Sequence, residues 1–226
     1  MKSINNYISE KLIINKNTGK ICYTYFPDTK KELKEIISQK IKEAGSSYGL
    51  NFNDIDVSGI DDMSELFLNW GFNGDISQWN VSNVKDMSSM FNGSRFDRDI
   101  SKWDVSNVEN MESMFMQSNF NGDISNWDVS NVKNMESMFY ESYFNGDISN
   151  WDVSNVKNMR YMFTYSSFNK DISQWNVINV KDMSRMFYNS RFNQDISEWN
   201  ISKVKDMFNI FKGSPLEGKE REWWNK

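Results

Sequence analysis

The sequence of 226 residues contains no histidine and only one cysteine, Cys22. Without histidine there can be no histidine-ligated metal site and no histidine general base, and a single cysteine cannot form an internal disulfide. Cys22 stands beside Ile21 and Tyr23 and has no basic neighbour in the sequence. We therefore interpret it as a small buried strand residue rather than a reactive thiol.

Long apolar runs are also missing. The first 20 residues show no apolar run of the kind that a signal peptide needs, and no later segment approaches the ~20 apolar residues of a membrane span. The net charge is -5, with lysine and glutamate interspersed, so no basic stripe for nucleic acid is evident. We expect a chain without a visible export address, cytoplasmic by default, with no membrane span and no nucleic-acid partner.

What the sequence does contain is a strict aromatic repeat. The hydrophobic fraction, 38%, is low for a compact globule, yet the chain has 16 phenylalanines and 9 tryptophans. Two aromatic columns recur every 24 residues without a gap: Trp79, Trp103, Trp127, Trp151, Trp175 and Trp199, and Phe91, Phe115, Phe139, Phe163, Phe187 and Phe211. A fixed period in this range is typical of a solenoid, in which one supersecondary unit stacks on copies of itself.

The apolar pattern within one repeat predicts a short helix and a short strand. We number positions one to twenty-four in frames that begin at Val57, Val81, Val105, Val129, Val153, Val177 and Ile201. In the fourth frame Met135, Met138 and Phe139 have helical spacing, and Asn134 precedes them as an N-cap. The turn signal at residues 145–147 ends this helix, and the Asp-Ile-Ser-x-Trp segment that follows is short enough to be one strand.

Both ends of the repeat array have the features of caps. Residues 11–26 are predicted to form a β-hairpin, and a helix follows whose capping box begins at Thr29 and whose end is Gly45. We divide the chain into an N-terminal cap (1–56), six repeats (57–200) and a degenerate seventh repeat with a C-terminal cap (201–226), closed by Trp223 and Trp224. The predicted fold is an α/β repeat solenoid of about seven rungs, each a short strand plus a short helix.

The pattern Phe-Asn-x-Asp-Ile-Ser-x-Trp-Asp-Val-Ser-Asn-Val-x-Asn-Met-x-x-Met-Phe, found between Asp54 and Phe211, resembles the BspA-like surface-protein repeats of bacteria, which are often called leucine-rich-repeat-like. The resemblance implies a right-handed stack and an adhesive or protein-binding role at the cell surface. It implies no catalysis, and it identifies no ligand.

A column of aspartates, one per frame, allows two interpretations. Stacked strands lie ~4.8 Å apart, so the carboxylates of this column would repel each other unless they were neutralised. Calcium ions bound to the carboxylate oxygens are one way to neutralise them. The other, which we favour, is that each aspartate accepts backbone N–H bonds at its turn or meets a basic residue such as Arg98 or Lys170. The members are Asp75, Asp99, Asp123, Asp147, Asp171 and Asp195.

Specificity in a repeat protein must lie in the residues that vary while the frame is kept. Positions nine, twelve, thirteen and fifteen are mostly small or polar in the first and third frames. In the fourth to sixth frames they hold residue types that are enriched at binding hot spots. This candidate partner-binding set comprises Tyr140, Tyr143, Tyr161, Tyr165, Arg185, Tyr188 and Arg191. The alternative is that these tyrosines only shield the flank of the helix.

We predict a non-enzymatic, monomeric module that binds another protein without a cofactor or metal. The acids recur identically in every frame, whereas an active site would be a single exception to the pattern, so we do not expect an enzyme. The alternative function is a calcium-stabilised or glycan-binding surface structural protein. The competing binding surface is the variable column on the strand side: Lys102, Asn126, Asn150, Gln174 and Glu198.

Overall fold

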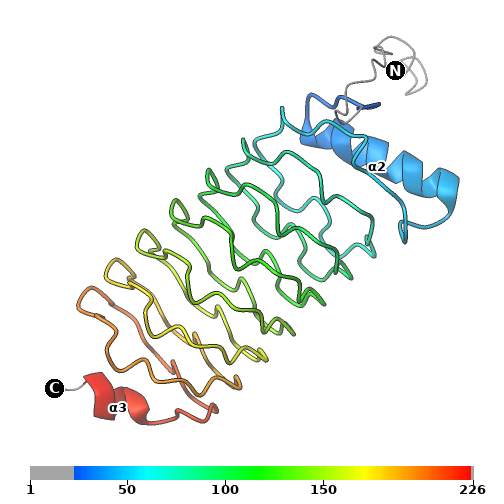
Figure 1. Cartoon of the computed structure of the whole chain (residues 1–226). Coiled ribbons are helices and arrows are strands. Elements are labelled where there is room, and N and C mark those ends of the chain that lie inside the picture. Colours follow the sequence, from blue (N-terminus) through cyan, green and yellow to red (C-terminus); the bar gives the residue numbers. More distant parts are fainter. Residues whose placement is uncertain (1–22, 225–226) are drawn as a thin grey trace.

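The computed structural model describes residues 23–224. They form an elongated stack of rungs with helix α2 (Lys30–Ala44) at one end and helix α3 (Lys219–Trp224) at the other (Figure 1). Cys22 and residues 11–22 of the expected hairpin lie outside the described residues. Residues 23–26 of the expected hairpin are described, and within them Tyr25 forms a parallel β-bridge with Ile55. Neither helix has the length and apolar character that crossing a bilayer requires.

Successive β-turns, rather than a helix and a strand, make up each rung. In the fourth frame the N–H groups of Met138 and Tyr140 donate to the carbonyls three residues earlier, at 3.3 and 3.1 Å. The intervening residues donate instead to the next rung, as Ser137 does to the carbonyl of Arg160 at 2.8 Å. Ser137 and Glu141 adopt the left-handed region, with φ of 55° and 50°, and these residues keep the chain from continuing as a helix.

The expected α/β rung is therefore wrong, although the repeat stack is confirmed. Met135, Met138 and Phe139 are all fully buried, as helical spacing predicts, but alternating turns bring them to the same side. A helix would use these N–H groups within its own rung and leave neighbouring rungs without backbone bonds between them. The expected strand is also a turn, in which Trp151 N–H donates to the Ile148 carbonyl at 3.2 Å.

The isolated β-bridges between successive repeats involve single residues at position six. Parallel bridges join these residues in consecutive rungs, from Asp62 and Asp86 to Asp182 and Asp206. The side chains of this column do not cap a helix as the sequence predicted; Asn134 accepts a hydrogen bond from the N–H of Glu136, two residues later, at 3.1 Å. This bond starts a series of turns instead of a helix.

Continuous aromatic columns fill the core. Phe115 and Phe139 of adjacent rungs stack at 5.8 Å, and within one rung Phe139 and Phe144 stack at 4.3 Å. Trp127, 3% exposed, donates its indole N–H to the carbonyl of Ile100 in the preceding rung at 3.1 Å. The same indole bond recurs for each tryptophan from Trp79 to Trp199. The tryptophans therefore add a polar link between rungs to their burial.

Helix α2 begins and ends as the sequence predicts. Thr29 accepts a hydrogen bond from Glu32 N–H, and Gly45 adopts φ of 79° while its N–H donates to Ile41. Leu33 and Ile37 are fully buried in the core. At the other end of the stack, the rings of Trp223 and Trp224 lie 5.9 and 5.7 Å from that of Phe211.

Replacing Trp127 by Ala should lower the free energy of unfolding by about 3–5 kcal/mol, because the change removes a buried aromatic side chain and leaves the Ile100 carbonyl without its indole partner. Chemical denaturation measures the loss. Trp223→Ala is the matched control, since Trp223 occupies the same frame position but is only half-buried and lies in the last frame of the described stack. Equal small losses at the two positions would contradict the role of the tryptophan column.

Candidate protein-binding site

Four of the predicted tyrosines form one continuous cluster across three rungs. The ring of Tyr140 lies 6.4 Å from Tyr161 and 6.2 Å from Tyr165, and the ring of Tyr165 lies 5.6 Å from Tyr188. All three pairs are close to perpendicular, with interplanar angles of 76–81°. This edge-to-face geometry is favourable for aromatic pairs. We call these four residues the tyrosine cluster.

Two arginines flank Tyr161. Arg185 donates to the Tyr161 hydroxyl at 2.7 Å and Arg160 donates to it at 3.1 Å. The guanidinium groups also lie over the ring, at 5.6 and 4.6 Å from its centre. The hydrogen bond from Arg160, followed by that from Arg185, lowers the pKa of Tyr161, because both favour the phenolate. Burial and the neighbouring Glu141 raise the pKa of Tyr140 instead.

The backbone under this cluster differs from the expected helix. Tyr161 and Tyr165 are not one helical turn apart; each lies in the left-handed region, with φ of 57° and 54°. They come together because both contact Tyr140 of the preceding rung. Tyr165 remains 49% exposed, whereas Tyr140, Tyr161 and Tyr188 are half-buried.

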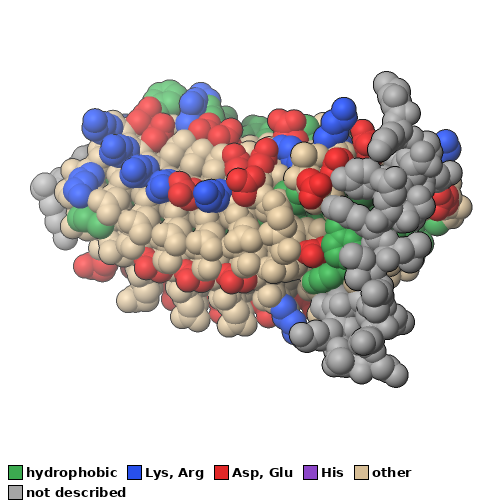
Figure 2. Space-filling view, turned by 90° about the horizontal axis from the view of Figure 1, so that it is seen from above, with side chains coloured by type: hydrophobic (Ala, Val, Ile, Leu, Met, Phe, Trp, Pro, Cys, Tyr) green, Lys and Arg blue, Asp and Glu red, His purple; other side chains and the backbone are tan. Residues whose placement is uncertain are grey.

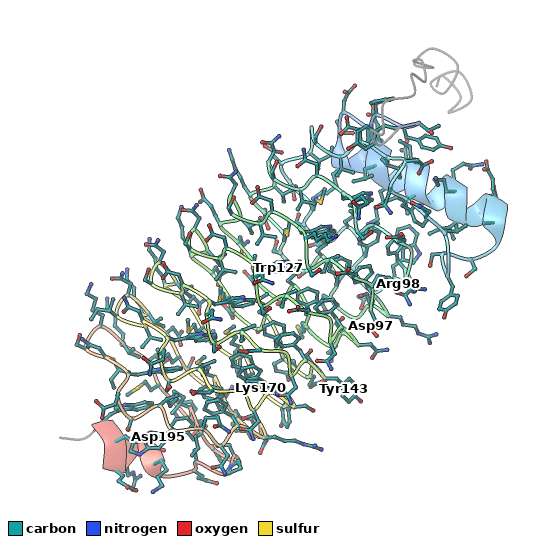
Figure 3. All side chains as sticks on the ribbon, viewed as in Figure 1. Asp97, Arg98, Trp127, Tyr143, Lys170 and Asp195 are labelled. Atoms are coloured by element: carbon teal, nitrogen blue, oxygen red, sulfur yellow. The ribbon has the colours of Figure 1, made fainter. Side chains whose placement is uncertain are left out.

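Two of the seven predicted residues lie apart from the cluster. Tyr143 and Arg191 occupy position fifteen, where both are exposed, and neither has a ring or hydrogen-bond contact with the tyrosine cluster among the described residues. Figure 3 shows Tyr143 at the outer edge of the stack, 69% exposed, on the side that carries Asp97 and Arg98. Tyr143 and Arg191 therefore lie apart from the other five residues of the predicted set.

Sequence reasoning missed two neighbours of the cluster. Arg160 contacts Tyr161, and the exposed Phe208 lies 5.5 Å from the guanidinium of Arg185. Both occupy position eight, which holds Ser, Glu, Arg or Phe in different frames. That variation is the signal that could have found them. Position eight directly follows the first apolar residue of the expected helix, where the sequence alone does not indicate a contact with a neighbouring rung.

The aspartate column has the geometry of repeated turns. In each rung the carboxylate accepts the N–H of the serine two residues later, for instance Ser125 to Asp123 at 2.9 Å and Ser149 to Asp147 at 3.0 Å. This confirms the turn interpretation. The hydrogen bond lowers the pKa of both carboxyl groups, and in Asp147 the charge of Lys170 contributes further. Across residues 23–224, no three acidic or other metal-ligating side chains gather into a group that could hold a metal ion.

The competing strand-side surface carries a shallow pocket of about 340 Å³. Carboxylates, amides and hydroxyls line it, including the predicted Gln174 and Glu198. Asp171 and Asp195 also line it, but their carboxylates are already bonded to Ser173 and Ser197.

The family of the chain follows from the repeat. A family model described as a Mycoplasma protein of unknown function, DUF285, matches residues 35–143 and again 117–224. The chain belongs to the DUF285 family. The two matches overlap over residues 117–143, in the third and fourth frames, as expected where every rung repeats the same pattern. No curated protein and no solved structure matches this DUF285 chain.

Tyr161 should lose its phenolic proton at a lower pH than Tyr140, because two guanidinium groups stabilise the phenolate of Tyr161. Ring-carbon chemical shifts followed over an alkaline pH titration measure both groups. Arg160→Ala should move the titration of Tyr161 upward. Identical titration of Tyr161 and Tyr140 would contradict the observed hydrogen bonds.

The aspartate column predicts sensitivity to acid. The pKa of Asp123 is lowered from 3.8 on folding, so the unfolded chain binds more protons around that pH, and stability must rise with pH through this window. We expect the melting temperature to be constant above about pH 5 and to fall as the pH drops below the pKa of an ordinary aspartate.

Asp123→Asn is the matched variant for this test, because asparagine keeps the turn acceptor without the titrating charge. It should leave stability at neutral pH nearly unchanged and reduce the acid sensitivity. Asp123→Ala, which removes the acceptor, should cost about 0.5–2 kcal/mol at neutral pH by analogy with cap deletions. Melting should be the same in excess EDTA and with added calcium. A large rise with calcium would support the calcium alternative.

Proposed function

We propose that this protein is a non-enzymatic module that binds another protein through the tyrosine cluster and its arginines. The observation that carries the proposal is the contiguity of Tyr140, Tyr161, Tyr165 and Tyr188 across adjacent rungs, with Arg185 packed among them. Large amphipathic side chains held in one arrangement lose little conformational freedom on binding. Tyrosine and arginine are the residue types that most often dominate binding energy at protein interfaces.

Two of the tyrosines stand at backbone positions that are left-handed throughout the stack. Positions nine and thirteen are left-handed in every frame, a conformation that glycine and asparagine adopt most easily. Asn69, Gly93 and Gly213 occupy such positions in other frames. Tyr161 and Tyr165 occupy them in the fifth frame, at a cost on the order of 1 kcal/mol or more each. Glu65, Gln117 and Glu141 adopt the same conformation in other frames, so it is a property of the stack, and the proposal rests on the contacts of the tyrosines.

The alternative is a glycan-binding structural protein that uses the strand-side pocket. Its amides and carboxylates are suitable partners for sugar hydroxyls, which is the observation in its favour. Its lining residues include no aromatic ring, and two of its carboxylates already serve the turns. We therefore rank it second. The BspA-like resemblance of the repeat favours an adhesive role for either surface.

Changing Tyr140, Tyr161 and Tyr188 together to Ser should weaken binding of the partner by about 2 kcal/mol or more while leaving the melting temperature nearly unchanged. The rung tolerates serine at this conformation, because Ser137 occupies the position of Tyr161 in the preceding frame with φ of 55°. Capture of partners by the purified chain, followed by titration of the captured protein, measures the effect.

The matched control changes Gln174 and Glu198 of the strand-side column to Ser. Partner affinity should be unaffected by this pair. If the pair weakens binding and the tyrosine variant retains full affinity, the binding site lies on the strand side and the alternative replaces our proposal.

A further inference from the structure

Three lysines at position five form an unpaired column beside the tyrosine cluster. Lys157, Lys181 and Lys205 occupy adjacent rungs and are directly bonded neighbours, since the N–H of each later lysine donates to the carbonyl of the previous one at 2.8 Å. All three side chains are exposed, and none has an ion pair among the described residues. By contrast, Lys133 in the same column pairs with Glu109.

The charge of this side of the stack changes sign along its length. Its outward positions are five, six, eight, nine, twelve and thirteen. In the first four frames they carry eight acidic and two basic residues, a net charge of -6. In the last three they carry six basic and two acidic residues, a net charge of +4, although the whole chain has -5. Figure 2 shows the corresponding file of basic side chains, which gives way to alternating charges toward the end that carries α2.

The arginines of the site add to this basic region. Neither Arg160 nor Arg185 forms an ion pair with a carboxylate in the described part of the chain. Both instead donate to the Tyr161 hydroxyl, which brings two guanidinium groups to one phenol oxygen. Glu136 and Asp182 act on Arg160 through their charge but form no ion pair with it. A carboxylate of a partner could therefore form charge-assisted hydrogen bonds with both arginines.

We infer that the partner is a protein whose contacting segment is acidic, lying along Lys157, Lys181 and Lys205 with its carboxylates toward Arg160 and Arg185. This inference rests on the proposed function and adds the chemistry of the partner. The aromatic rings of the tyrosine cluster supply the apolar part of the contact, and the basic column orients the segment along the stack. The acidic outward residues of the first four frames repel the carboxylates of such a segment and confine these carboxylates to the last three frames, while its apolar residues can still reach Tyr140.

A peptide segment fits this surface better than a nucleic acid does. Asp182 and Asp206 lie in the same rungs as the lysines and would oppose a continuous line of phosphates. An acidic peptide can place neutral residues opposite these two carboxylates.

The test selects random linear peptides displayed on phage against the full chain and measures the affinity of the enriched peptides at low and high salt. We expect enriched peptides to combine aspartate or glutamate runs with aromatic or aliphatic residues, and to bind more weakly as salt rises. The variant K157Q/K181Q/K205Q should weaken them by roughly tenfold or more. The control K31Q/K34Q/K42Q changes the net charge equally at exposed lysines of α2 and should have no effect.

Several outcomes would overturn the inference, and they separate it from the proposed function. If the peptides are neutral or basic but are lost in the Tyr140/Tyr161/Tyr188→Ser variant, the acidic partner is wrong while protein binding through the tyrosines stands. If acidic peptides depend on the lysines but not on the tyrosines, the charge argument stands and the tyrosine footprint fails. Equal binding of a single-stranded oligonucleotide would indicate a general polyanion site. Self-association at low salt would indicate that the acidic half of a second copy occupies the surface.

Discussion

The backbone hydrogen bonds between successive rungs are the interaction on which the other features of this protein depend. Alternate N–H groups of each rung donate to the next rung, and the remaining ones close turns within their own. This division satisfies the polar backbone around a core that is only one rung wide. It also requires left-handed residues at two positions in every frame, which removes the option of a helix. The register of 24 residues follows, because each rung must place the same groups opposite the same partners.

The side chains repeat because this register repeats. Aromatic residues stack on their counterparts one rung away, and polar side chains near the turns bond to the backbone two residues on or to the neighbouring rung. Stability in such an array is shared between neighbours, so a defect in a central rung affects more contacts than one at an end. Function is then restricted to outward positions, where a change of residue leaves the backbone pattern intact.

The candidate site uses these outward positions, two of which have an unfavourable left-handed backbone conformation. Tyr161 and Tyr165 stand in the left-handed positions nine and thirteen of their frame, and the hydroxyl of Tyr161 accepts hydrogen bonds from two guanidinium groups. The contacting pairs of the tyrosine cluster are therefore 21 to 25 positions apart along the chain but adjacent across rungs. The same stacking places Lys157, Lys181 and Lys205 next to one another, and none of the three forms an ion pair among the described residues. A surface of this kind presents aromatic area and positive charge together.

The sequence by itself determined the period, the inward aromatic and methionine positions, the turn role of the aspartates and the N-terminal helix, because each depends on local chemistry repeated at fixed spacing. It also located five of the residues that meet around the tyrosine cluster. Only the tertiary structure decided that the rungs are made of turns, since that outcome depends on bonds between rungs that no single repeat contains. For the same reason it decided that Arg160 and Phe208 join the site and that Tyr143 and Arg191 do not. Contacts between residues of neighbouring rungs are set by the stacking geometry, and the order of residues within one frame does not encode them.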